Sequence, residues 1–258
     1  MRLSIDVLLD YTIAEPCDVL LQIEAAAMAD QRLEEQSLRV YSPEALRAML
    51  GEDGIGQRSW AVGAGSFRAE YNAVVAIDRL TCDLAALGDT SPRALPAPTI
   101  PYLLPSRYCE SDRFEGFVEA EFPGLKGGAL AARLSRWVSD HLTYASGSSS
   151  GITTAMMTFA ERRGVCRDYA HLLVALARAG GIPARCVSAY APGVTPPDFH
   201  AVAELWLEGG WHLVDATGMA ACGEIARVVV GRDATDIAFM TIFGTATLNE
   251  QSVCVTRL

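Results

Sequence analysis

The sequence lacks a hydrophobic run that approaches the roughly 20 apolar residues needed for a membrane-spanning helix. Its first residues, MRLSIDVLLDYTI, also lack the basic start, the uninterrupted apolar block and the small-residue cleavage site of a secretory signal. They alternate between polar and apolar residues instead, as a β-strand does. We therefore expect a cytoplasmic protein that has no membrane partner.

An excess of positive charge is also lacking. The chain has 21 Lys and Arg residues against 31 Asp and Glu residues, which gives a formal net charge of −10. Non-specific binding to nucleic acid needs a basic surface that displaces counterions from phosphates. The composition therefore predicts no nucleic-acid partner, and it leaves the oligomeric state open.

Two metal-ligand patterns are missing, since no C-x-x-C pair and no H-E-x-x-H run occur among the 258 residues. The number of cysteines is odd and their spacing is wide, which disfavours a disulfide framework. We expect reduced thiols, no metal and no cofactor. The seven cysteines are Cys17, Cys82, Cys109, Cys166, Cys186, Cys222 and Cys254.

Residues 1–90 have the character of a small β-rich domain. Apolar residues alternate with their neighbours in several short segments, and turn-forming glycines separate these segments, which predicts a β-sandwich-like unit. Residues 43–49 are open to a short helix. Five prolines between residues 90 and 105 indicate a linker over 91–105, because proline removes backbone donors and stiffens the chain.

Residues 106–258 have a different character, with helices first and strands afterwards. Apolar periodicity predicts helices over 130–141, 153–162 and 168–179. Strands are predicted over 184–190, 201–207, 211–214, 225–230 and 253–256. Glu208-Gly209-Gly210 turns two of these strands into a hairpin. The expected fold class is therefore α+β, with an N-terminal β domain, a linker and a larger second domain.

Cys166 is the strongest candidate for a nucleophile. It follows Gly164-Val165 and opens the helix predicted over 168–179. The start of a helix offers unpaired N–H groups and a positive dipole end, which stabilise a thiolate and an oxyanion. In isolation, a cysteine before an apolar helix is more often a small core residue.

His200 and Asp215 provide the partners that a thiol nucleophile needs. His200 opens the first arm of the predicted hairpin and Asp215 ends the return arm, so both lie at one end of the sheet. His200 would take the thiol proton, and Asp215 would fix the ring tautomer. Taken singly, His200 reads equally as a solvated loop residue and Asp215 as a turn residue. The hairpin register is not determined by the sequence.

Several motifs resemble those of the transglutaminase-like superfamily. The nucleophile motif is matched by Gly164-Val165-Cys166-Arg167-Asp168-Tyr169-Ala170-His171, and the histidine motif by Asp198-Phe199-His200-Ala201. Trp211-His212-Leu213-Val214-Asp215-Ala216-Thr217 is similar to the aspartate motif. The segment Tyr102-Leu103-Leu104-Pro105-Ser106-Arg107-Tyr108 is similar to that of bacterial members with a β-rich N-terminal region. Two positions depart from the family pattern, where Val202 and Ala216 stand in place of Trp and Pro.

The resemblance implies a papain-like α+β core and acyl chemistry on amide bonds through a thioester, with Cys166, His200 and Asp215 as the catalytic triad. The partner would be a peptide or protein amide. Resolution by water gives a peptidase or amidase, which we expect first because it needs no second substrate site. Resolution by an amine gives a transglutaminase. A third interpretation is an inactive binding module that retains the fold.

Other residues of these motifs are expected to play supporting parts. Trp137 is interpreted as a core residue rather than an oxyanion partner. Asp168 would either form a hydrogen bond with a neighbouring loop or cap the first helical turn. His171 is interpreted as a buried, neutral residue. Arg185 would pair with Asp168 or Glu204.

Overall fold

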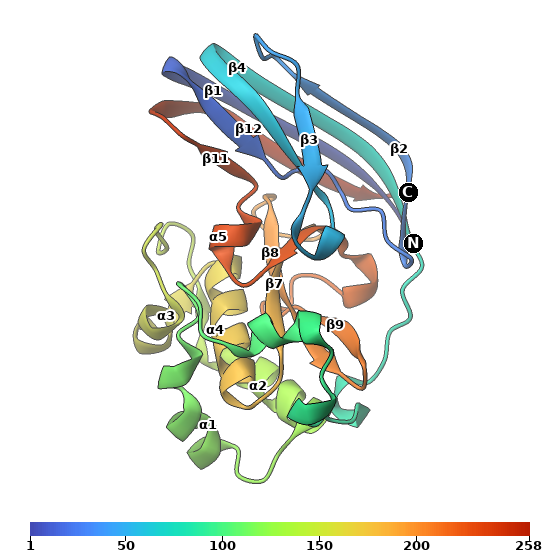
Figure 1. The fold of residues 1–258 in the computed structure, drawn as a ribbon, viewed down its shortest axis with the longest axis vertical. Coiled ribbons are helices and arrows are strands. Elements are labelled where there is room, and N and C mark those ends of the chain that lie inside the picture. The colour runs from blue at the N-terminus through green and yellow to red at the C-terminus, as the bar shows by residue number, and fades with distance from the viewer.

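The computed structural model describes residues 1–258 and has an α+β fold made of a large antiparallel sheet above a helix-and-sheet unit (Figure 1). The large sheet has six strands in the order β11-β1-β4-β2, with β12 also paired to β1 and β3 also paired to β4. Its strands are β1 (Arg2–Leu21), β2 (Gln31–Val40), β3 (Arg47–Leu50), β4 (Gln57–Ile77), β11 (Met240–Ile242) and β12 (Ala246–Arg257). No helix is long and apolar enough to cross a membrane.

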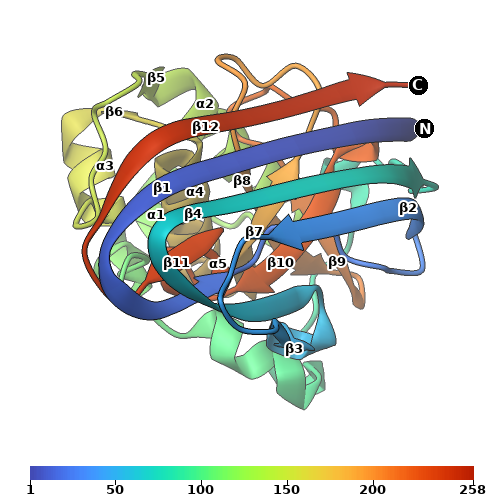
Figure 2. The same ribbon diagram turned by 90° about the horizontal axis from the view of Figure 1, so that it is seen from above.

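Two long strands, β1 and β4, form the centre of this sheet. Buried and exposed side chains alternate along both strands, because one face of the sheet packs on the core and the other meets solvent. A register shift between Ile13 and Cys17 interrupts the pairing of β1 with β4, and the strands curve strongly in Figure 2. The expected sandwich-like unit is therefore one bent sheet, since β1 and β4 each run through both of its halves.

The two ends of the chain meet in this sheet. β12 pairs with β1 from Leu3↔Arg257 to Ile13↔Ala246, and Figure 2 shows these strands side by side, with the two termini close together. The division of the chain into two domains at residues 91–105 stays a prediction. The strands β11 and β12, although they come at the end of the chain, complete the sheet of the N-terminal region. Pairing with β12 satisfies backbone groups that would otherwise form an open edge on β1.

Residues 47–50 and the proline-rich stretch differ in structure from what the sequence predicted. Residues 47–50 form strand β3 on β4, so the short helix considered for 43–49 is wrong there. The proline-rich stretch contains the 3-10 turns Pro92–Ala94 and Ala97–Leu103. Tyr102 from the second turn is buried edge-on against Trp211, with ring centroids 5.3 Å apart. This contact ties the stretch to the second sheet.

The helix-and-sheet unit packs helices against a four-stranded antiparallel sheet in the order β10-β7-β8-β9. Its strands are β7 (Ala184–Tyr190), β8 (His200–Leu207), β9 (Gly210–Val214) and β10 (Ala226–Gly231). Its helices are α1 (Glu115–Glu121), α2 (Gly127–His141), α3 (Ala155–Glu161), α4 (Cys166–Ala179) and α5 (Ala234–Ile237). The central helix α4 is buried from Asp168 to Arg178, because β7 and β8 cover one side and α2 and α3 another.

A buried ionic network joins the two sheets. Glu204 on β8 is 0% exposed and accepts hydrogen bonds from Arg185 Nε at 2.8 Å and Arg227 Nε at 2.6 Å. Arg227 also contacts Asp30, which lies just before β2, at 2.9 Å. Buried charges need such partners, because desolvation penalises each one left alone. The expected alternative of Arg185 pairing with Glu204 is confirmed.

Candidate active site

Cys166 is the first residue of α4, as the sequence predicted. Asp168 holds the start of this helix, because its Oδ2 accepts the amide of Val165 at 2.7 Å while its own amide donates to the Val165 carbonyl at 2.9 Å. Ser149 donates to the other carboxylate oxygen at 2.8 Å. The thiol is half-buried at the positive end of the helix dipole, which stabilises a thiolate.

His200 and Asp215 lie within hydrogen-bond distance, with His200 Nε2 2.9 Å from Asp215 Oδ2. The hairpin register brings them together, because Ala203 of β8 faces Val214 of β9 and the two residues extend from this end of the pairing. Their side chains are 0% and 2% exposed. The contact is therefore shielded from competing water.

The electrostatics of this pair favour a charged imidazole. Burial opposes the charge on His200, but the hydrogen bond with Asp215 and the nearby charges of Asp215 and Cys166 raise its pKa to about 9. Burial likewise opposes the charge on Asp215, yet the hydrogen bond with His200 holds its pKa below the ordinary value. Since Nε2 is engaged with Asp215, His200 Nδ1 is the nitrogen left for the thiol, and no hydrogen-bond partner occupies it.

In this arrangement the thiol lies outside strict hydrogen-bond geometry with His200. Cys166 Sγ is 3.9 Å from the carbonyl oxygen of Phe199, the residue directly before His200. The hydrogen bond between a nucleophile and its base is often long in an enzyme without substrate, and it tightens when substrate binds. Cys166 and His200 both line the same cleft.

Asp215 is oriented by donors that the sequence reasoning had not assigned. Its Oδ1 accepts the amide of Thr217 at 2.9 Å and the hydroxyl of Thr217 at 2.7 Å. Its Oδ2 accepts the amide of Ala220 at 3.0 Å in addition to the imidazole. In the sequence, Thr217 stands out only as the last residue of the segment that resembles the aspartate motif. These bonds leave the carboxylate little freedom to rotate away from His200.

Tyr144 is a further residue beside the thiol that sequence reasoning missed. The short parallel pair of β5 (Thr143–Tyr144) and β6 (Arg163–Gly164) places Tyr144 opposite Gly164, two residues before Cys166. Burial and the proximity of Cys166 raise the pKa of Tyr144 to about 12, so the phenol stays protonated and can donate. No local motif marks this residue, because the contact depends on pairing between distant segments.

Trp137 lies in the core, as predicted. Its ring is 8% exposed and stacks on His141 and Phe159, with centroids 4.4 Å and 5.5 Å apart. Trp137 therefore packs against other aromatic rings, and it is not among the residues that line the cleft beside Cys166.

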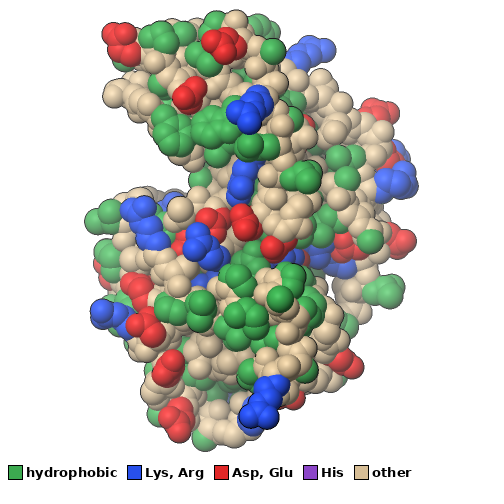
Figure 3. All heavy atoms as spheres, viewed as in Figure 1, with side chains coloured by type: hydrophobic (Ala, Val, Ile, Leu, Met, Phe, Trp, Pro, Cys, Tyr) green, Lys and Arg blue, Asp and Glu red, His purple; other side chains and the backbone are tan.

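The cleft beside Cys166 has a volume of about 380 Å³ and lies between the helices and the large sheet. Figure 3 shows this face of the molecule hollowed between the upper and lower units. Contributors are the start of α4, the loop into β8 and the α5–β11 segment. The lining residues are Ser149, Val165, Cys166, Arg167, Ser188, Asp198, Phe199, His200, Ala201, Ala234, Ile237, Ala238, Phe239 and Met240.

The large sheet holds the segment that carries the histidine. Phe239, directly before β11, stacks on Phe199 with ring centroids 4.1 Å apart and an interplanar angle of 4°. Gln251 of β12 donates to Asp198 Oδ1 at 2.7 Å. The C-terminal strands thus brace the two residues that precede His200.

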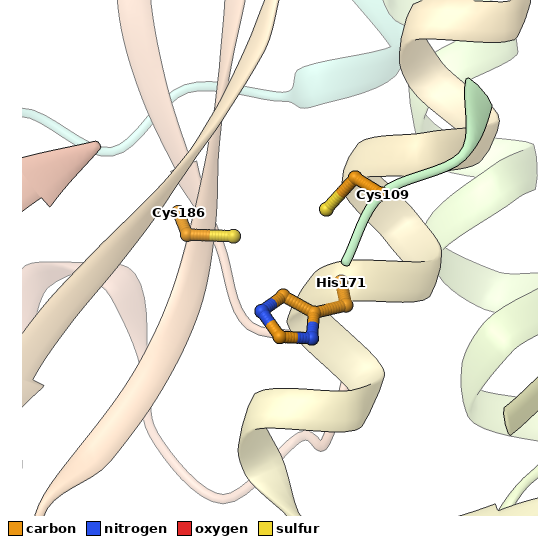
Figure 4. Close-up of side chains that lie close together, drawn as sticks. All are labelled: Cys109, His171 and Cys186. Atoms are coloured by element: carbon orange, nitrogen blue, oxygen red, sulfur yellow. The ribbon is translucent and has the colours of Figure 1, made fainter. Parts of the chain in front are cut away.

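A second cluster of potential ligands, Cys109, His171 and Cys186, is fully buried in the core (Figure 4). One ligand atom from each residue lies within 4.8 Å of the others, and two thiolates with an imidazole would suit a thiophilic cation. However, His171 Nε2 already accepts the amide of Ala234 at 3.0 Å. Coordination through Nε2 would leave that buried amide without a partner, so the cluster fits core packing better.

His171 is buried, and burial lowers its pKa to about 3. Its ring stacks on Tyr108 with centroids 5.2 Å apart and an interplanar angle of 1°. It is therefore neutral at physiological pH, as predicted.

The sequence and the fold of this chain are similar to those of known proteins. The family model of the transglutaminase-like superfamily matches residues 123–216, a range that contains Cys166, His200 and Asp215. The crystal structure of a candidate cysteine protease from Cytophaga hutchinsonii superposes with a TM-score of 0.93. The two sequences are 32% identical, and the match covers 99% of this chain and 90% of that one. This chain belongs to the transglutaminase-like superfamily.

One curated relative is similar to this chain over only part of its length. Uncharacterized protein ML0607 of Mycobacterium leprae (strain TN) is 32% identical over 112 residues, which are 40% of each chain. The chain therefore spans about 40% of the length of that relative. The likeness to the Cytophaga hutchinsonii protein, in contrast, extends over the bent sheet as well as the core.

Proposed function

We propose that this protein is a cysteine hydrolase that cleaves amide bonds of peptides or proteins through a thioester on Cys166. The observation that supports this most directly is the state of His200. Its Nε2 is engaged with Asp215 at 2.9 Å, its pKa is raised to about 9, and its Nδ1 is free for the thiol. A thiol at a helix start and an oriented base are the two requirements of a cysteine nucleophile.

The reaction would begin with transfer of the Cys166 proton to His200 Nδ1, while Asp215 stabilises the imidazolium. The thiolate sulfur then forms a bond to the carbonyl carbon, and the carbonyl electrons move to the oxygen. The amide of Cys166 and the hydroxyl of Tyr144 are the donors that could stabilise this oxyanion. Collapse of the intermediate breaks the C–N bond, and the imidazolium gives its proton to the departing amine.

Water would complete the cycle. His200, neutral again, takes a proton from water as the oxygen attacks the thioester carbon, and the thiolate leaves with its bonding electrons. The products are a carboxylic acid and the regenerated ion pair. Hydrolysis is our first choice because the thiol is half-buried in a cleft that opens on the surface, whereas transfer to an amine needs exclusion of water. Faster incorporation of an amine than hydrolysis would favour a transglutaminase.

The test is alkylation of the native protein by iodoacetamide across a pH series, with each cysteine peptide quantified by mass spectrometry. We expect Cys166 to react fastest well below pH ~8.5, the ordinary thiol value, and His200→Ala to remove that advantage. Cys254, which is exposed, serves as the reference thiol within the same molecule. Slow labelling of Cys166 at every pH, with normal labelling after denaturation, would instead favour an inactive binding module.

A further inference from the structure

One wall of the cleft is apolar and comes from the segment that joins α5 to β11. Ile237, Phe239 and Met240 of this segment line the cleft together with Cys166. The cleft volume of about 380 Å³ is at the lower end of the range for small-ligand pockets, roughly 300–1,000 Å³. It can therefore hold one or two residues of a peptide, with one side chain against this wall.

The charged residues of the cleft give no preference for a charged ligand. Arg167 and Asp198 have opposite signs, so together they add no net charge to the cleft. Arg167 Nη2 donates to Ser149 Oγ at 2.7 Å, and Asp198 Oδ1 accepts from Gln251 at 2.7 Å. The apolar wall is therefore the part of the cleft with unused capacity to distinguish side chains.

Gln22, which is 3% exposed, holds the backbone of this wall. Its amide donates to the Phe239 carbonyl at 2.8 Å, and its Nε2 donates to the carbonyls of Asp236 at 3.1 Å and Ala238 at 2.9 Å. Its Oε1 accepts from Arg58 Nε at 3.0 Å. One residue of the N-terminal region thus makes three bonds to the wall, which is formed before any ligand binds.

We propose that this wall determines substrate choice, with Ile237 and Met240 receiving an apolar side chain next to the scissile amide. Gln22 is the positioning residue that keeps the wall in place. The inference rests on the proposed function for the reaction, but binding can be measured without catalysis. A single methylene in an apolar pocket discriminates by roughly 10- to 200-fold, so leucine and phenylalanine should be preferred over alanine and charged residues.

The first experiment measures binding to the full chain carrying Cys166→Ala. The probes are blocked tripeptides, acetyl-Ala-X-Ala-amide, in which X is Leu, Phe, Ala, Lys or Asp, titrated by saturation-transfer NMR. We expect the Leu and Phe peptides to bind roughly tenfold or more tightly than the Ala peptide, and the Lys and Asp peptides to bind most weakly. Equal affinities, or no binding by any peptide, would overturn the inference.

Variants of the wall test the assignment of residues. Met240→Asp should remove the preference for Leu and favour the Lys peptide, whereas Met157→Asp, at an exposed position of α3 outside the cleft, should not change the order. Met240→Ala replaces Met240→Asp if the charged variant does not fold, and it should weaken binding of the Leu peptide. The inference is wrong if folded Met240→Asp keeps the wild-type order, or if folded Met240→Ala keeps the wild-type affinity for the Leu peptide.

Gln22→Leu separates positioning from catalysis. It should reduce the ratio of Leu to Ala affinity by a larger factor than it changes the rate at which iodoacetamide labels Cys166, because this small reagent does not need the wall. An unchanged affinity ratio in the folded variant would remove Gln22 from the inference. Unselective binding with fast labelling of Cys166 would refute the wall and leave the proposed hydrolase. Selective binding, with Cys166 labelled no faster than the reference thiol Cys254, would refute the proposed hydrolase and leave the role of the wall.

Discussion

Replacing Asp215 by asparagine removes one charge and forces a conflict between hydrogen-bond donors. Asp215 Oδ2 accepts from His200 and Ala220, and Oδ1 accepts from the amide and hydroxyl of Thr217. An asparagine side chain has one oxygen and one NH2 group, so one side must oppose donor to donor. If NH2 faces His200, the ring proton moves to Nδ1, which then presents N–H to the thiol instead of a lone pair.

The size of the effect follows from the pKa of His200. The rise from 6.5 to about 9 corresponds to about 3 kcal/mol in favour of the imidazolium. The hydrogen bond with Asp215 is the largest interaction that raises this pKa, so loss of the Asp215 charge weakens the ion pair of imidazolium and thiolate. The wrong tautomer lowers the rate further. We expect Asp215→Asn to reduce both alkylation of Cys166 and hydrolysis by roughly 100- to 1,000-fold at pH 7.

The assay compares initial alkylation rates of Cys166 with those of Cys254 in the same molecule, and kcat/KM for any amide substrate that is found. Asp140→Asn is the matched control, because Asp140 is an exposed residue of α2 that pairs only with Arg136. Thermal unfolding establishes that both variants are folded. If folded Asp215→Asn were labelled at the wild-type rate with an unchanged pH profile, the assigned role of Asp215 would be refuted.

Three further predictions concern His200, Tyr144 and Glu204. The folded-state pKa of His200 is raised from 6.5 to about 9, so its stabilisation is fully present below pH ~6.5 and is lost as pH rises through 9. The unfolding free energy of the wild type relative to His200→Gln should therefore fall by about 3 kcal/mol between pH 6 and pH 10 in urea titrations. Tyr144→Phe should lower kcat by roughly tenfold or more with little change in KM, and alkylation of Cys166, which forms no oxyanion, should keep its rate. A parallel loss of alkylation would contradict an oxyanion role. Glu204→Ala leaves two buried arginines without their shared carboxylate and should cost about 3–5 kcal/mol in urea unfolding, whereas a cost near that of Asp140→Asn would show that the network is dispensable.

Local sequence patterns predicted many of the helices and strands of the helix-and-sheet unit. The apolar periodicity over 168–179 predicted α4, and Cys166 was placed at its start. Glu208-Gly209-Gly210 identified the hairpin of β8 and β9, which put His200 and Asp215 at one end of the sheet. These features were predictable because helix periodicity, helix ends and tight turns depend on residues a few positions apart.

Pairing between distant segments was decided only by the tertiary structure. The hairpin register set the 2.9 Å contact between His200 and Asp215, and β5–β6 pairing brought Tyr144 to the thiol. β1 binds β12 from the other end of the chain, which made one bent sheet out of strands that suggested a sandwich. Strand periodicity states which residues share a face, but it carries no information on which distant strand lies alongside, because that choice depends on the packing of the whole core.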